Sequence, residues 1–202
     1  GLIRDIFTTN LLGASIFHDI FVVVLKIPNV FRKLFAEGAF SQAFIPIYSE
    51  YLGKQDERGG QDFLNALFGL LLSALFIFTL LALLFAPIFI LIFAPGFYFD
   101  IQKQDLAVNL LRIMFPYLAL ISLVAFAAGI QNSHNKFSIP AVTPLIFNLS
   151  LIGSAWLVAP KIEIPVMALA WGVLLAGFLQ LLFQIAPLTI IQKIPVPKIN
   201  LS

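Results

Sequence analysis

Long apolar stretches separated by short polar segments run the length of the chain. Four of them cover residues 63–99, 106–135, 137–160 and 164–192, with Arg112 as the only Asp, Glu, Lys or Arg inside them. Each is longer than the roughly 20 residues that a helix needs to cross a bilayer. The short alternating strands of a membrane barrel do not recur, so helices are expected. The pattern predicts an all-α, polytopic membrane helix bundle.

Polar and turn-forming residues between these stretches predict about six transmembrane helices, the first of them truncated. The expected ranges are 2–12, 16–52, 62–86, 105–132, 139–158 and 164–191. The second is unusually long, and Pro28 or the region of Gly38 is where we expect it to bend. Pro87 and Pro95 are expected to mark a frayed end of the third helix.

The composition agrees with a lipid environment and excludes several classes of function. Hydrophobic residues make up 60% of the chain and charged residues 11%, against about 25% charged residues in soluble domains. The net charge is only +2 and the basic residues are scattered along the sequence, which argues against nucleic-acid binding. The chain has no cysteine and two isolated histidines, so neither a metal site nor another cofactor is expected.

Basic residues predict how the bundle sits in the membrane. If successive spans alternate in direction, one side receives Lys103 and Lys161, and the other side receives a larger basic group. That group consists of Lys54, Arg58, Lys136, Lys193 and Lys198. By the positive-inside rule its side is cytoplasmic, so the chain is expected to end in the cytoplasm.

The second predicted helix carries an unusual load of charge for a membrane span. It contains Asp19, Lys26, Arg32 and Lys33, with Glu37 just beyond. Charges near the bilayer centre cost about 2.5–3.5 kcal/mol each, so five cost about 15 kcal/mol. The large apolar residues of the segment return about 4–8 kcal/mol. A helix surrounded by lipid is therefore unfavourable, and the charges must face water or other charges.

Helical geometry groups most of these charges. At about 100° per residue, four of them fall within about 40° of one another, while Arg32 lies well off their stripe if the helix is straight. The stripe consists of Asp19, Lys26, Lys33 and Glu37, extended by Asn29 and Ser41. The first predicted helix adds Arg4 and Asp5.

Two interpretations of the charged helix remain open. In the first, the charges form ion pairs between helices, or the helix lies on the membrane surface. In the second, which we favour, they line a hydrated path, because ionisable residues inside membranes mark substrate or ion pathways. Excess cations suit an anionic substrate, and phosphate is the natural candidate because guanidinium binds it bidentately and lysine binds it as a point charge.

The charged segment, KIPNVFRKLFAEGAFSQAFIPIYSEY, resembles the signature of the lipid II flippase family MurJ, also called MviN, within the multidrug/oligosaccharidyl-lipid/polysaccharide exporter superfamily. The resemblance continues in order over nearly the whole chain. It includes GLIRDIF, APGF, FPYLALISL, NKFSIPAVTPLIFNLSLIG, ALAWGV and LQLLFQ. AEGAFSQAF followed by NKFSIPA is a specific combination.

The resemblance implies a two-lobed transporter that moves lipid-linked peptidoglycan precursor, lipid II, across the bacterial inner membrane by alternating access. Residues 1–192 would form the transmembrane N-terminal lobe. Residues 193–202 would be a cytoplasmic linker towards a C-terminal lobe of the same chain. We expect a fragment of a longer protein, because the chain starts within an apolar pattern and ends after the Pro-rich IPVPKINLS.

The resemblance also implies roles for individual residues. Arg4 of GLIRD and Arg32 of PNVFRK match positions of a cationic cavity for the diphosphate and sugar headgroup, and Lys33 stands where many members have a second arginine. The expected cavity or gating residues are Asp5, Asp19, Lys26, Asn29 and Glu37. An arginine that the family pattern places upstream of GLIRD is not in this sequence.

Alternatives to lipid II flipping are a flippase for another lipid-linked oligosaccharide, a drug antiporter, an enzyme acting on lipid diphosphates, and a scaffold module. The enzyme is disfavoured because no carboxylate pair has metal-ligand spacing beside a suitable partner. Gln180 and Gln184, one helical turn apart, and Asn148 are expected to form interhelical hydrogen bonds and not to contact substrate.

Overall fold

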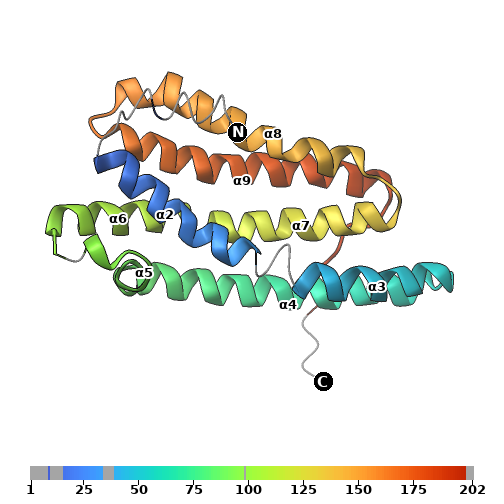
Figure 1. Ribbon diagram of the computed structural model, residues 1–202. Helices are drawn as coiled ribbons and strands as arrows, with labels where there is room; N and C mark the ends of the chain where they lie inside the picture. Colours follow the sequence, from blue (N-terminus) through green and yellow to red (C-terminus); the bar gives the residue numbers. More distant parts are fainter. Residues whose placement is uncertain (1–8, 10–15, 34–38, 98, 199–202) are drawn as a thin grey trace.

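The computed structural model describes residue 9 and the ranges 16–33, 39–97 and 99–198, and these residues form a helical bundle. The α-helices, labelled as in Figure 1, are α2 (Ile16–Arg32), α3 (Ala39–Gly53), α4 (Glu57–Leu84), α5 (Ala86–Phe93), α6 (Ile101–Met114), α7 (Tyr117–Ser133), α8 (Ser138–Gly153) and α9 (Pro165–Ile190). Short 3-10 or π segments cover Pro95–Phe97, Ser154–Val158 and Ala159–Lys161. The predicted all-α class is confirmed.

Within the described part of the chain, four helical segments are long and apolar enough to cross a membrane. They are Glu57–Leu84, Ile101–Ser133, Ser138–Lys161 and Pro165–Ile190. They correspond to the last four of the six predicted spans, and the chain is a multi-pass membrane protein. The first predicted helix, 2–12, lies outside the described residues except for residue 9.

The structure describes the predicted second helix on both sides of residues 34–38. Its two described parts, α2 and α3, have 17 and 15 residues. At about 1.5 Å per residue each is shorter than the roughly 30 Å hydrocarbon core. Pro28 lies inside α2 and does not end it, and the region of Gly38, the other expected bend, lies outside the described residues.

Two other predicted helices differ in detail. The end of the third is not frayed: α4 stops at Leu84, and Pro87 stands in the first turn of a separate short helix, α5. The fourth begins at Ile101 and is interrupted between α6 and α7 at Phe115 and Pro116. Pro116 has no N–H to donate to the carbonyl of Arg112, so one helical hydrogen bond is missing at the interruption.

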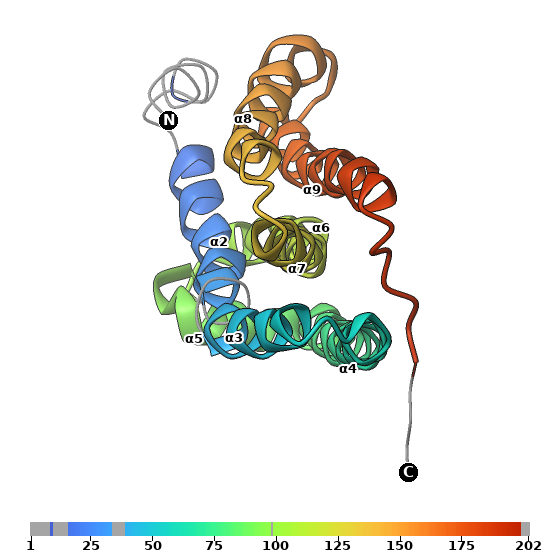
Figure 2. The ribbon, with the colours of Figure 1, turned by 90° about the vertical axis from the view of Figure 1, so that its right-hand side faces the viewer.

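The helices pack in layers around α7. Figure 2 looks along the bundle and shows α7 in its middle, α3 and α4 on one side, α8 and α9 on the other, and α2 beside it. Phe44, Leu64 and Phe126 belong to one apolar cluster, which joins α3, α4 and α7. A second cluster joins α2, α6 and α9 through residues such as Val24 and Leu111. Two apolar cores therefore hold the described helices together.

Small residues allow α8 and α9 to approach closely. Ser150 Oγ donates a hydrogen bond of 2.9 Å to the backbone oxygen of Gly172. A Cβ at Gly172 would collide with the hydroxyl of Ser154. This is the small-residue packing that replaces the hydrophobic effect between helices in lipid.

The connections alternate between the two ends of the bundle. The α3–α4 and α7–α8 connections lie at the right-hand end in Figure 1, and the α8–α9 connection lies at the left-hand end. The right-hand end therefore carries Lys54 and Lys136, and the left-hand end carries Lys161. This agrees with the assumption that successive spans alternate in direction, on which the comparison of basic residues rests. Which end faces the cytoplasm stays a prediction.

Candidate functional site

A cavity of about 620 Å³ opens between α2, α7, α8 and α9. Its lining residues come from the second half of α2, the second half of the span that α6 and α7 form together, the first two-thirds of α8 and the second half of α9. It therefore lies in the half of the bundle nearer the α7–α8 connection. The polar lining residues are Asn29, Arg32, Lys33, Tyr117, Thr143, Asn148, Gln180 and Gln184.

One wall of this cavity, the cationic wall, consists of Asn29 and Arg32 of α2 and of Lys33, which directly follows α2. Nε of Arg32 donates a hydrogen bond of 3.4 Å to Oδ1 of Asn29, three residues earlier. At about 100° per residue, Arg32 and Lys33 lie about 60° and 40° on either side of Asn29. The two cations therefore border one cavity although they are consecutive in sequence.

The face of α2 that lines the cavity is not the face that carries the predicted stripe of charges. The wheel put Lys33 in one stripe with Asp19 and Lys26, and put Arg32 outside it. In the structure Asp19 and Lys26 are exposed and are not among the described residues that line the cavity. Around the axis of α2, Asp19 and Lys26 lie beyond Lys33 as seen from Asn29, outside the part of the helix surface that lines the cavity. The packing of α2 decides this face, and charge periodicity alone does not reveal it.

Three further predicted residues lie outside the described part of the chain. They are Arg4, Asp5 and Glu37. Their assignment to the cavity stays a prediction, as do the roles assigned to Arg32, Lys33 and Asn29.

The opposite side of the cavity is a network of neutral polar groups. Nε2 of Gln180 donates to the backbone oxygen of Thr143 at 3.1 Å, and Nε2 of Gln184 donates to Oγ1 of Thr143 at 2.6 Å. Nε2 of Gln131 on α7 donates to Oε1 of Gln184. The network ties α7, α8 and α9 together, as predicted for the two α9 glutamines.

The sequence reasoning missed that these same amides border the cavity. Gln180 and Gln184 are 3% and 0% exposed, yet both line it together with Arg32. The signal was present in the i, i+4 spacing of two amides within an apolar span. Asn148, expected to be buried, is half-buried, and its Nδ2 donates to the oxygen of Pro144 within its own helix at 3.2 Å.

Comparison with known proteins identifies the family. The model of the family described as lipid II flippase MurJ matches residues 8–200. The chain belongs to the lipid II flippase MurJ family. The resemblance of the charged segment and of the later motifs is thereby confirmed.

Relatives in this MurJ family are similar along nearly the whole chain. The chain is 40% identical over 200 residues to the probable lipid II flippase MurJ of Buchnera aphidicola subsp. Schizaphis graminum, and 38% identical over 200 residues to the lipid II flippase MurJ of Burkholderia cenocepacia. Each match covers 99% of this chain and 39% of the relative. The probable lipid II flippase MurJ of Vibrio cholerae is 39% identical over 92% of this chain and 37% of its own length. The chain thus spans about two-fifths of these MurJ relatives.

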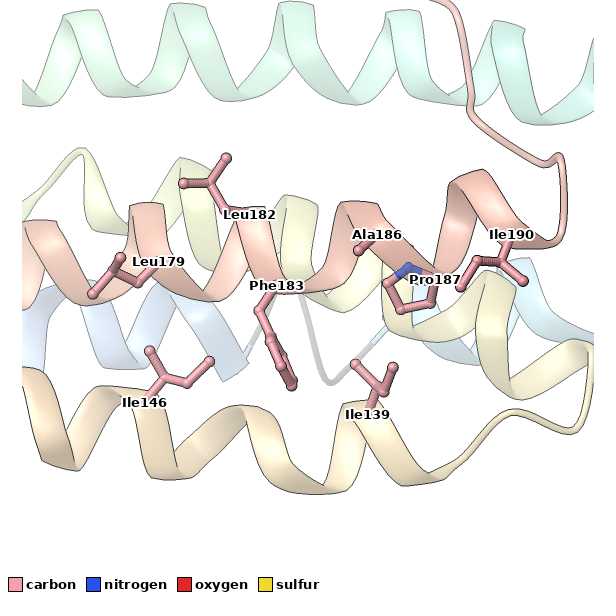
Figure 3. Close-up of a pocket in the computed structure, with 8 residues that line it drawn as sticks. All are labelled: Ile139, Ile146, Leu179, Leu182, Phe183, Ala186, Pro187 and Ile190. Atoms are coloured by element: carbon pink, nitrogen blue, oxygen red, sulfur yellow. The ribbon is translucent and has the colours of Figure 1, made fainter.

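A second pocket of this MurJ family chain is different in character. It is a groove of about 540 Å³ between α8 and α9, drawn in Figure 3. Only apolar residues line it: Ile139, Ile146, Leu179, Leu182, Phe183, Ala186, Pro187 and Ile190. Figure 3 shows Phe183 pointing from α9 towards α8. Without a polar group to orient a ligand, the groove suits hydrocarbon chains of the surrounding lipid, and the cationic cavity remains the candidate site.

Proposed function

We propose that this chain is the N-terminal lobe of a flippase that moves lipid-linked peptidoglycan precursor across the bacterial inner membrane. The relatives that it matches are named lipid II flippases. In this proposal the cavity bordered by α2 holds the diphosphate and sugar headgroup while the polyprenyl chain stays in lipid. No covalent bond is broken, so the protein is a transporter and not an enzyme.

The observation that carries the proposal is that Arg32 and Lys33 border one cavity within the bundle. Cations inside a membrane are costly and are retained where they serve a path. A guanidinium matches two phosphate oxygens at once, and a neighbouring ammonium adds a point charge. The pair therefore suits a diphosphate better than a neutral or cationic drug.

The position of the cavity fits uptake from the inner leaflet. It lies nearer the end of the bundle that carries Lys54, Arg58 and Lys136, which the positive-inside rule assigns to the cytoplasm. A C-terminal lobe of the same chain, joined through the linker 193–202, would close the cavity and allow the two lobes to rock. Arg4 is proposed to add a further cation to the site.

The remaining charged residues are proposed to act in gating. Asp5, Asp19 and Glu37 would pair with cations in one state of the cycle and release them in another. Lys26, exposed on α2, would be a partner for these carboxylates. Such exchange of partners gives a helix two stable positions, which alternating access requires.

Binding of lipid II to the full-length protein tests the proposal. Replacing Arg32 with alanine should weaken binding about 10- to 100-fold, because a charged hydrogen-bond pair contributes about 1.5–3 kcal/mol. Arg32→Lys should fall between, since the charge is kept and the bidentate contact is lost. Arg58→Ala removes an exposed cation away from the cavity and should leave binding unchanged. Equal affinities of Arg32→Ala and the unmodified protein would contradict the proposal.

A further inference from the structure

The apolar groove between α8 and α9 adjoins a further pocket, here called the end pocket. The end pocket has a volume of about 430 Å³. Its lining residues come from the α7–α8 connection, the start of α8, the end of α9 and the residue that follows α9. Three residues line both the groove and the end pocket: Ile139, Pro187 and Ile190. The groove therefore leads into the end pocket at the end of the bundle that carries the α7–α8 connection.

The groove has the length of one leaflet of a bilayer. On α9 its lining residues run from Leu179, near the middle of the helix, to Ile190, the last residue of the helix. At 1.5 Å per residue this stretch is about 16 Å long, and half of a 30 Å hydrocarbon core is about 15 Å. Figure 3 shows Ile146 and Ile139 of α8 on the other side of the groove. The groove thus extends from one membrane surface to about the middle of the membrane.

The end pocket supplies the polar groups that the groove lacks. Its polar lining residues are Asn135, Lys136 and Ser138. All three are exposed, so a ligand can reach them. Lys136 carries a positive charge, and its ammonium group forms no ion pair within the described part of the chain. An apolar groove one leaflet long therefore ends beside an accessible cation.

This arrangement matches the parts of a phospholipid. An acyl chain can lie in the groove through the van der Waals packing that also holds membrane helices together. Its phosphate then reaches the level of the end pocket, where the ammonium group of Lys136 attracts it as a point charge. Basic pockets between membrane helices bind anionic lipid head groups in the same way.

The lining of the end pocket favours a head group without an amine. Phosphatidylethanolamine carries an ammonium group beside its phosphate, and neither Asp nor Glu lines the end pocket to pair with it. Lys136 would repel that group. The glycerol head of phosphatidylglycerol is uncharged, and its hydroxyls can exchange hydrogen bonds with the side chains of Asn135 and Ser138. The charge balance therefore favours an anionic lipid over a zwitterionic one.

We propose that the groove and the end pocket together bind one anionic phospholipid of the phosphatidylglycerol type. One acyl chain lies between α8 and α9, and the phosphate lies at Lys136. The lipid belongs to the leaflet at the end of the bundle that carries the α7–α8 connection. This site shares no lining residue with the cationic cavity, so it does not depend on the proposed function.

Photo-crosslinking in vesicles tests the site. The full-length protein is reconstituted in phosphatidylcholine vesicles with a trace of phosphatidylglycerol or phosphatidylethanolamine, each carrying the same photoreactive acyl chain. Labelling of residues 179–190, mapped by mass spectrometry, is the readout. The phosphatidylglycerol probe should label them about fivefold more strongly, because one lysine near anionic lipid changes affinity by about that factor.

A pair of variants tests the charge. Lys136→Gln removes the cation from an exposed connection and should bring the labelling ratio of the two probes close to one. Arg58→Gln removes an exposed cation from the first turn of α4, at the same end of the bundle but outside the groove and the end pocket. It should leave the ratio at its original value.

A second pair tests the groove. Ala186 is exposed and lines the groove, so Ala186→Phe should fill the groove without disturbing the core and should reduce labelling by both probes. Ala74→Phe makes the same change at an exposed position of α4 outside the groove. It should leave labelling of residues 179–190 unchanged.

Other occupants of the groove would give different results, and each of these would overturn the proposal. Equal labelling by the two probes, or a ratio that survives Lys136→Gln, would show unselective contact with bulk lipid. Loss of labelling on addition of an equal amount of undecaprenyl diphosphate would show that a polyprenyl chain occupies the groove. No labelling by either probe would show that protein covers it.

Discussion

The side chains of Tyr48 and His134 meet at the end of the bundle that carries the α7–α8 connection, with Oη of Tyr48 3.0 Å from Nε2 of His134. Tyr48 belongs to α3 and His134 follows the last residue of α7. Burial, together with the positive charge of Lys193, lowers the pKa of His134 below its usual value of 6.5. The contact therefore joins two helices through a histidine that resists protonation.

This contact predicts that stability falls in mild acid. Since the pKa of His134 is lower in the folded protein than in the unfolded chain, the unfolded chain binds the proton first. The stabilising contribution is complete above about pH 6.5 and is lost as the pH falls from there through the folded-state pKa. The thermal unfolding midpoint in detergent should drop between pH 7.5 and 5.5. His134→Gln should flatten that drop, and an equal drop in this variant would show that other groups cause it.

The hydrogen bonds of Thr143 predict that Thr143→Val and Thr79→Val change the free energy of unfolding differently. Thr143→Val removes the hydroxyl that accepts from Gln184 and donates to the oxygen of Ile139 at 2.9 Å. The loss should destabilise the protein by about 0.6–1.7 kcal/mol, the range measured for hydrogen bonds between membrane helices. Unfolding titrations in mixed detergent would measure it.

Thr79 is the matched control for that experiment. Its Oγ1 is buried and has no hydrogen-bond partner in the described part of the chain. Thr79→Val should therefore leave the free energy of unfolding unchanged or raise it, because an unpaired polar atom is replaced by a methyl group. Equal losses at both threonines would contradict the role of the network around Thr143.

The packing of the segment after α9 against α4 predicts that a side chain at position 69 displaces this segment. Residues 194–198 run along α4, where the backbone N–H of Val196 donates to Oδ1 of Asn65 at 2.8 Å and Nζ of Lys198 lies 2.8 Å from Oδ1 of Asp62. A Cβ at Gly69 would lie 2.6 Å from the backbone oxygen of Lys198. Gly69→Ala should therefore displace this segment and speed tryptic cleavage after Lys198.

A second helical glycine controls for the general effect of alanine. Gly153 has nothing within 4 Å of an added Cβ, so Gly153→Ala should be neutral or stabilise its helix by up to about 1 kcal/mol. Cleavage after Lys198 should not change in this variant. If Gly69→Ala behaves in the same way, the segment 194–198 does not pack against α4 as described.

Apolar runs predicted the membrane helices closely because lipid leaves the backbone no other way to satisfy its hydrogen bonds. The last predicted helix, 164–191, is Pro165–Ile190 in the structure. Breaks were harder to predict. Pro144 and Pro187 stand inside continuous helices, whereas the fourth predicted span is interrupted at Pro116. Whether a proline ends a helix depends on what surrounds it, which the local sequence does not contain.

By itself the sequence determined a polytopic helical membrane protein whose second predicted span carries charges that lipid does not tolerate. Tertiary structure decided which of these charges share a cavity. It placed Arg32 beside Lys33 on one wall, left Asp19 and Lys26 exposed elsewhere, and brought Gln180 from the far end of the chain to the facing wall. The reason is physical: hydropathy is a property of a segment, whereas a cavity is formed by the packing of segments that are distant in sequence.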